Sequence, residues 1–384
     1  MLFEAAKLEG KALEVLAAID EMRRVLKNRI SVPQRWYGLL RRNSFARAIR
    51  GSNSIEGYNV SREDAIAAAE GDEPVEAKGT TWLAVTGYRN AMTFVLQLAQ
   101  DANFKYNLGF IRSLHYMMLH YDLAKHPGNW RPGPIYVLDE AKKEVVYEGP
   151  EAERVPSLID ELIEFLNDKY DPSEVTIKAA MAHLNLVLIH PFSDGNGRMA
   201  RCLQTLVLAR EGILESAFCS IEEYLGANTQ DYYAALAETA KGSWQPHNKT
   251  KEWIKFNLVA HYRQASTILR RTHLIDRIWG EIEREIARRS LPERAIYALT
   301  DAAIGYKVRN ASYRGIAEVS PNLASRDLQS MVDSGMLVAV GEKRGREYVA
   351  SDYLKNLRAR LGQVGKIPDP FKEMVPAGQL SLLP

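Results

Sequence analysis

A polar segment of twelve residues between two helical patterns places the strongest constraint on the fold of this chain. It runs from His190 to Arg201 and reads His-Pro-Phe-Ser-Asp-Gly-Asn-Gly-Arg-Met-Ala-Arg. Apolar residues recur at every third or fourth position on both sides, at Ile177, Ala180, Met181, Leu184, Val187 and Leu188 upstream and at Met199, Cys202, Leu203, Leu206 and Val207 downstream. Asp171, Pro172 and Glu174 are start signals for the upstream helix. The spacing predicts a helix, a tight polar turn and a second helix at the mouth of a helical core.

The polar segment combines residues that suit an anion. Gly195 and Gly197 let backbone N–H groups approach an anion closely, and the following helix adds the positive end of its dipole. Arg198 and Arg201 lie three positions apart, so they project from one face of that helix and can hold neighbouring phosphates. Each feature by itself is common, since a G-x-G turn is usually a plain turn and exposed arginines are usually solvated.

Two further side chains of the segment supply chemistry. Asp194 is a hard oxygen ligand of the kind that holds Mg²⁺ between phosphates. His190 closes the upstream helix, where a histidine commonly interacts with the helix dipole, but it can also accept the proton of an attacking hydroxyl. Taken together, the segment indicates nucleotidyl transfer, in which positioning and charge neutralisation provide most of the catalysis.

The segment resembles the signature of the Fic (filamentation induced by cyclic AMP) family, His-x-Phe-x-Asp/Glu-Gly-Asn-Gly-Arg-x-x-Arg, which is complete from His190 to Arg201. The resemblance implies a protein adenylyltransferase that moves AMP from ATP to a Ser, Thr or Tyr hydroxyl of a target protein. It implies that His190 is the general base and that Asp194 holds Mg²⁺ or Mn²⁺. The nucleotide phosphates would then contact Gly195, Asn196, Gly197, Arg198, Met199, Ala200 and Arg201.

A second motif lies upstream, in the stretch from Gly51 to Asn59. Its composition alone predicts a loop with a short capped helix, after a helical segment that ends near Arg50. Within the stretch, Ser52-x-x-x-Glu56-Gly57 resembles the inhibitory motif of many Fic proteins. The resemblance implies that Glu56 pairs with Arg201 and withholds it from the γ-phosphate of ATP.

The stretch from Pro127 to Pro134 interrupts the helical pattern, and a β-hairpin is expected directly after it. Residues 135–138 and 144–147 are the two strands. A surface hairpin is the plain interpretation. In the Fic family this position resembles the flap that pairs with an extended target segment, and Ile135 or Val137 would touch the adenine. Downstream, Tyr232-Tyr233 resembles a family doublet beside the nucleobase and ribose, although such a doublet is usually a structural aromatic pair.

Composition limits the class of protein. The chain has 384 residues and a formal net charge of +2, which argues against a nucleic-acid coat or a polybasic membrane anchor. No apolar run reaches membrane-spanning length, and the first 26 residues lack the apolar core of a signal peptide. We therefore expect a cytoplasmic protein with no membrane partner. We also expect a homodimer. The expected substrate is a hydroxyl of a target protein, or a hydroxyl of this protein itself.

The expected architecture is mostly α: a Fic-type helical bundle with a β-hairpin flap, followed by a C-terminal winged helix-turn-helix. The regions are 1–95 with the inhibitory motif, 96–263 as catalytic core, 264–290 as connector helix, 291–355 as winged helix and 356–384 as a weakly structured tail. Helices are expected at 11–27, 62–75, 81–99, 108–121 and 152–168. His115 and His120 lie in one of these without a carboxylate or thiol to complete a metal site, so we expect core or surface histidines.

The C-terminal region resembles a winged helix because three short helical patterns, 291–300, 313–319 and 323–334, precede strands at 337–340 and 346–350. Arg326 on the third helix, with Lys343, Arg344 and Arg346 on the wing, provides a modest basic patch for nucleic acid. Asp327 and Asp333 weaken that patch, so a protein-docking domain remains an alternative to DNA binding.

Two other functions remain open on the sequence. One is a DNA-binding regulator whose Fic-like half only senses nucleotide, although a sensor has no need of the base His190. The other is the reverse reaction, removal of AMP, with Glu56 positioning a water molecule. The chain has no Walker-type Gly-x-x-x-x-Gly-Lys-Ser/Thr, which disfavours a P-loop NTPase.

Overall fold

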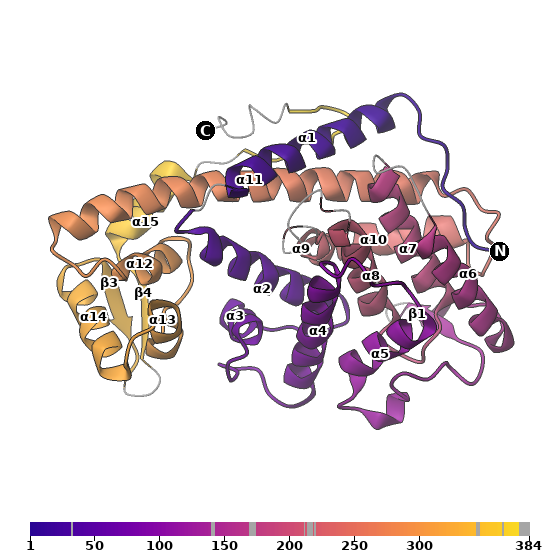
Figure 1. Cartoon of the computed structure of the whole chain (residues 1–384), viewed down its shortest axis with the longest axis horizontal. Helices are drawn as coiled ribbons and strands as arrows, with labels where there is room; N and C mark the ends of the chain where they lie inside the picture. Colours follow the sequence, from indigo (N-terminus) through magenta and orange to yellow (C-terminus); the bar gives the residue numbers. More distant parts are fainter. Residues whose placement is uncertain are drawn as a thin grey trace. The chain divides into compact units, whose positions relative to one another are not determined.

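The computed structural model describes the chain except for residues 32–33, 140–142, 169–173, 211, 213–217, 219, 343–345, 363–364 and 376–384. The described residues are mostly helical, as expected (Figure 1). They form two compact units. The first contains described residues from 1–27, 44–265 and 368–374, and the second contains those from 28–43 and 266–367. No described helix is both long and apolar enough to span a membrane.

The first unit is a helical bundle around α7 and α8. Its helices are α1 (Lys11–Ser31, in part), α2 (Tyr37–Ile55, in part), α3 (Arg62–Glu70), α4 (Gly79–Leu98), α5 (Leu108–Leu119), η1 (Leu123–Lys125), η2 (Ala152–Arg154), α6 (Val155–Asn167), α7 (Val175–Ile189), α8 (Asn196–Arg210), α9 (Glu222–Ala227), α10 (Thr229–Ala240) and α11 (Lys251–Arg288, in part). All of α7 is buried, since its sequence is apolar on nearly every side and α6 and α8 pack against it. The expected cap residues Asp171 and Pro172 lie outside the described residues. The helix pair therefore places the polar turn inside the bundle.

Helix α2 differs from the expectation that it ends near Arg50, because it continues to Ile55. Ser54 Oγ donates to the carbonyl of Gly51, and Asn53 Nδ2 donates to the carbonyl of Ile49. These side chains thus bond back to the helix that they were expected to end. The helix ends at Ile55, and the backbone turns away at Gly57, whose φ of 82° is left-handed. Ser52 and Glu56 are consequently presented from one helical end rather than from a loop.

The hairpin is present within one residue of its expected position, as β1 (Tyr136–Asp139) paired antiparallel with β2 (Glu144–Glu148). A bulge lies between Val137 and Leu138. On the other edge of β2, the backbone N–H of Glu148 donates to the carbonyl of Gly242 at 2.9 Å. In the described sheet β1 pairs with β2 alone, so the outer edge of β1 has no strand beside it.

Within the second unit, three short helices and a hairpin follow one another in the expected order. They are α12 (Ala295–Ala303), α13 (Asn310–Ala317), α14 (Pro321–Asp333), β3 (Leu337–Val340) and β4 (Glu347–Ala350). Val308 and Tyr348 exchange two backbone hydrogen bonds of 2.8 Å, so β4 is also paired on its second edge. Asp327 is buried and accepts from Arg294 Nε at 2.6 Å. Lys343 and Arg344 of the expected wing lie outside the described residues, and the winged-helix assignment stays a prediction.

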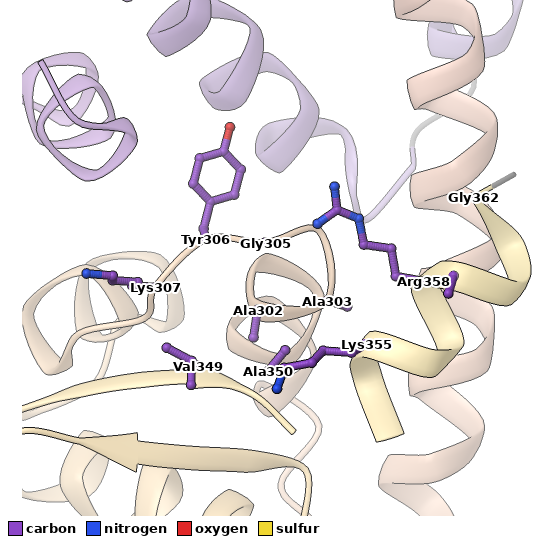
Figure 2. A pocket seen from close by; sticks show the side chains of 11 residues that line it. Ala302, Ala303, Gly305, Tyr306, Lys307, Val349, Ala350, Lys355, Arg358 and Gly362 are labelled. Carbon is purple, nitrogen blue, oxygen red and sulfur yellow. The ribbon is translucent and has the colours of Figure 1, made fainter. Parts of the chain in front are cut away.

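Two boundaries differ from the sequence expectations. The segment expected as a separate connector at 264–290 belongs to one helix, α11 (Lys251–Arg288), because its apolar stripe continues without a stop signal. The tail expected from residue 356 begins inside another helix, α15 (Asp352–Leu361), which buries Leu354 and Leu357. A cavity of about 450 Å³ opens beside α12, β4 and α15, with Tyr306 and Arg358 at its wall (Figure 2).

Candidate active site

The polar turn is fixed by its own backbone and by Asn196. His190 caps α7 with a left-handed φ of 51°, and Gly195 follows with a φ of 79°. Asn196 Oδ1 accepts from the N–H of Phe192 at 3.0 Å, and Asn196 Nδ2 donates to the carbonyl of Phe192 at 2.8 Å. The side chain expected at a phosphate therefore closes the turn. An anion would meet the backbone of Asn196 at the start of α8 instead.

The imidazole of His190 is held in one tautomer. Its Nδ1 lies 3.1 Å from the carbonyl oxygen of Val187, which can only accept, so Nδ1 carries the proton and Nε2 does not. Burial lowers the pKa of His190, and the charge of Arg131 lowers it further. A neutral imidazole with an unprotonated Nε2 is the state that a general base requires at neutral pH.

Arg131 positions His190 and was missed in the sequence, where it is one basic residue in a Pro- and Gly-rich stretch. It is buried, with 4% of its surface exposed. Its Nε donates to the carbonyl of His190 at 2.9 Å and its backbone N–H donates to the carbonyl of Pro191 at 2.9 Å. The guanidinium also donates to the carbonyls of Gly133 and Pro150. One side chain thus ties the start of the hairpin to the end of α7.

Arg198 fits an anion. Its side chain is fully buried, and its three guanidinium nitrogens have no hydrogen-bond partner among the described residues. The Asp194 carboxylate lies 3.9 Å away, and the ring of Tyr58 lies 5.3 Å from the guanidinium carbon. Each buried unsatisfied polar group costs roughly 1–3 kcal/mol. A phosphate accepting from these donors would remove that cost, so the residues suit the expected nucleotide.

Arg201 is instead engaged by the upstream motif. Its Nε donates to Ser52 Oγ at 2.7 Å, and its second terminal nitrogen donates to Glu56 Oε1 at 2.7 Å and to the carbonyl of Ser52 at 3.1 Å. The guanidinium is fully buried, whereas Glu56 keeps 21% of its side chain exposed. A Cβ on Gly197 would lie 2.5 Å from Glu56 Oε1, so a side chain at this position would displace that carboxylate. The ion pair expected between Glu56 and Arg201 is present.

Asp194, the expected metal ligand, forms a close ion pair with Lys125 Nζ from η1, a partner that the sequence did not reveal. Burial alone would raise the pKa of Asp194, but the hydrogen bond from Lys125 and the charge of Arg198 outweigh it and lower the pKa. The carboxylate is therefore ionised at neutral pH and suits a divalent cation. Mg²⁺ commonly takes one or two carboxylates and completes its shell with phosphate oxygens and water.

His115 joins the loop that carries Lys125 to the turn that carries Asp194. The N–H of Gly128 donates to His115 Nδ1 at 2.8 Å, so His115 Nε2 carries the proton and donates to the carbonyl of Asp194 at 3.0 Å. Burial lowers the pKa of His115 to about 4, which keeps it neutral. The ring stacks on Phe192 at 3.7 Å. His115 is thus a core histidine, whereas His120 is exposed.

The remaining expected contacts have mixed surroundings. Tyr232 is buried and its hydroxyl lies 3.0 Å from His183 Nε2, whereas Tyr233 is 47% exposed and bonds weakly to the carbonyl of Ile55 at 3.4 Å. Tyr233 is therefore the member of the doublet that a nucleotide can reach more easily. Ile135 and Val137 are half-buried in the hairpin. Their expected contact with adenine stays a prediction.

Comparison with known proteins gives a family for this region. Residues 105–208 match the Fic/DOC family. Protein adenylyltransferase fic-1 of Caenorhabditis elegans is 37% identical over 98 residues, which are 24% of this chain and 18% of that protein. Protein adenylyltransferase Fic of Nematostella vectensis is 27% identical over 238 residues, or 61% of this chain and 52% of that protein. The match thus spans about half of the Nematostella vectensis protein and less than a fifth of the Caenorhabditis elegans protein.

A solved structure extends the likeness to nearly the whole chain. The crystal structure of a Fic family protein from Desulfovibrio desulfuricans G20 has a TM-score of 0.57 and 20% sequence identity, and the match covers 91% of this chain and 99% of that one. At this identity the likeness shows the fold. The Fic-type helical bundle expected from the sequence is therefore confirmed.

Proposed function

Because this chain carries a Fic domain of the Fic/DOC family, we propose that it is a protein adenylyltransferase that transfers AMP from ATP to a Ser, Thr or Tyr hydroxyl of a target protein. The observation that carries the proposal is the neutral His190, whose turn leads into the start of α8, where the buried guanidinium of Arg198 has no hydrogen-bond partner among the described residues. A base and an anion site in one rigid turn are what a hydroxyl and a triphosphate need to react.

In the proposed reaction the target hydroxyl attacks the α-phosphorus of ATP and pyrophosphate leaves. His190 Nε2 accepts the hydroxyl proton, while the carbonyl of Val187 keeps the other proton on Nδ1. Arg198 and the backbone N–H groups at the start of α8 hold the phosphates. Asp194 would hold Mg²⁺ or Mn²⁺, which when bound neutralises phosphate charge.

The wild-type protein is proposed to be self-inhibited. Arg201 lies three residues beyond Arg198 on α8, and the motif Ser52-x-x-x-Glu56 occupies two of its nitrogens. A γ-phosphate would have to compete with a carboxylate and a hydroxyl for the same donors. ATP then binds with its α-phosphate turned away from in-line attack, so transfer is slow until Glu56 withdraws.

The target is proposed to bind at the hairpin. β1 pairs with β2 alone in the described sheet, so its outer edge can pair with an extended segment of another protein. The protein is also proposed as a substrate of its own reaction. We further propose that it is a homodimer and that it acts in the cytoplasm. A regulator that only senses nucleotide would not need the His190 tautomer.

The experiment that tests the function replaces the base. His190→Ala is expected to lower AMP transfer by about 10²–10⁴-fold, the usual contribution of a positioned base. ATP binding should persist because the phosphate donors remain. Mass spectrometry of the protein after incubation with ATP and Mg²⁺ measures self-modification, and Glu56→Gly is the active background. Equal labelling with and without His190 would refute the assignment.

A further inference from the structure

The ion pair between Lys125 and Asp194 places an ammonium group where the proposed function needs a divalent cation. Lys125 Nζ contacts Asp194 Oδ2, while Oδ1 accepts from the N–H of Gly195. Both oxygens of the carboxylate are therefore engaged. The two side chains are partly buried, with 32% and 29% exposed, so water screens the pair less than it screens a surface ion pair.

The backbone segments that carry Lys125 and Asp194 are both held by hydrogen bonds. Lys125 ends the turn η1, which begins at Asp122 with a side-chain hydrogen bond to the N–H of Ala124. The imidazole of His115 then accepts from Gly128 on the Lys125 side and donates to the carbonyl of Asp194 on the other. One buried ring thus links the loop that follows Lys125 to the backbone of Asp194.

We propose that Lys125 is a built-in counter-cation of Asp194 that competes with the divalent metal for this carboxylate. The proposal rests on the proposed function, since it concerns the metal that accompanies the nucleotide. Mg²⁺ binds carboxylate oxygens at about 2.0–2.1 Å, and an ammonium group on the same oxygen would repel it. Lys125 must therefore leave Oδ2 before the metal binds. The apparent affinity for the metal falls in proportion to the fraction of protein in which the ion pair is open.

The competition predicts a definite direction for binding. Calorimetry measures the Kd of ADP in EDTA and in saturating Mn²⁺. The Kd in EDTA divided by the Kd in Mn²⁺ reports how much the metal strengthens ADP binding, without turnover. Lys125→Met should increase this ratio about fivefold, which corresponds to about 1 kcal/mol, near the upper end for a partly exposed pair. Lys125→Arg keeps the charge and should leave the ratio near the wild-type value. Lys105→Met removes an exposed lysine elsewhere in the same domain and should change nothing.

Each other outcome overturns the proposal. An unchanged or smaller ratio for Lys125→Met means that Lys125 does not compete with the metal. Weaker ADP binding in EDTA assigns Lys125 to the phosphates instead. Lys125→Gln, checked by its melting curve, replaces the methionine variant if that variant fails to fold.

Asp194→Asn separates this proposal from the proposed function. The variant should abolish most of the metal contribution to ADP binding. If it does so while Lys125→Met has no effect, the Lys125 proposal alone fails. If Asp194→Asn has no effect either, Asp194 is not the metal ligand, and that part of the proposed function fails as well.

Discussion

At the scale of single residues, the two arginines at the start of α8 differ in what they contact. Arg198 is buried without a hydrogen-bond partner in the described part of the chain, and Arg201 is buried with Ser52 and Glu56 as partners. Removing one member of a buried ion pair commonly costs 3–5 kcal/mol, because the other charge is left unpaired. An ATP γ-phosphate can take the place of the carboxylate on Arg201. Under the proposed function, Arg198 is free to bind one part of the triphosphate, whereas Arg201 is withheld from another part.

Glu56→Gly should increase AMP transfer because it frees Arg201 for the γ-phosphate. Each tenfold change in the productive population needs about 1.4 kcal/mol, so an increase of at least tenfold is expected. Adding Arg201→Ala should cancel the gain, since the freed donors are then absent. Incorporation of labelled AMP by the three proteins at equal concentration is the measurement. Faster loss of AMP from modified protein in wild type than in Glu56→Gly would instead favour AMP removal with Glu56 positioning water.

The lowered pKa of His190 predicts the pH dependence of transfer. The base form is present above the folded pKa, which lies below the 6.5 of an ordinary histidine. Activity should therefore fall only as the pH drops below 6.5. In Glu56→Gly the acid limb should move lower still, because the charge of Glu56 raises the pKa of His190. Initial rates of the Glu56→Gly protein between pH 5 and 8 check this, and an acid limb centred above 6.5 would contradict the assigned surroundings.

At the scale of elements, the position of Glu56 depends on how closely α2 and α9 approach. A Cβ on Gly226 would lie 2.6 Å from the carbonyl oxygen of Gly51, and a Cβ on Gly51 would lie 2.3 Å from that of Glu222. The backbones of the two helices are thus in contact through their glycines. Beneath them, the hydroxyl of Tyr88 donates to the buried carboxyl of Glu222 at 2.5 Å. This contact fixes the end of α2 that bears Ser52 and Glu56.

Gly226→Ala should therefore loosen the inhibitory motif. The added methyl group forces α2 away from α9, and overpacking of this kind typically costs about 1–3 kcal/mol of stability. AMP transfer should rise toward the level of Glu56→Gly, and the melting temperature should fall. Gly38→Ala is the control, because Gly38 lies in α2 and a Cβ there has no atom within 4 Å. A variant that is destabilised yet no more active would separate the helix contact from inhibition.

The sequence predicted the elements well and the contacts between them unevenly. The periodic segments gave α7, α8 and the hairpin almost at their observed bounds, and the two motifs gave the ion pair of Glu56 with Arg201. Lys125, His115 and Arg131 could not be found as site residues because each reaches the turn from a loop or helix distant in sequence. The predicted end of α2 near Arg50 was wrong. The local tendency of Ser and Asn to end a helix was outweighed by the burial of Ser52 and Asn53.

At the scale of the whole molecule, the second unit decides whether the protein has a partner besides its target. Its cations are largely committed internally. Lys307 and Arg309 both contact Glu347, and Arg294 contacts Asp327. Asp327 was expected to offset the basic patch, but its charge is used by Arg294. Of the expected basic contacts, Arg326 and Arg346 lie within the described residues, and both are exposed.

Any binding of duplex DNA should therefore be weak and should depend on Arg326 and Arg346. Replacing either arginine by alanine should reduce the slope of log K against log salt by about 1 if that side chain neutralises a phosphate. Fluorescence anisotropy of a labelled duplex, titrated with the full chain between low and physiological salt, provides the slope. Arg24→Ala in the first unit is the control, since Arg24 is 69% exposed and should leave the slope unchanged. Equal binding by wild type and by the double variant of Arg326 and Arg346 would show that these two arginines do not contact the DNA, and the absence of any binding by wild type would favour the protein-docking alternative.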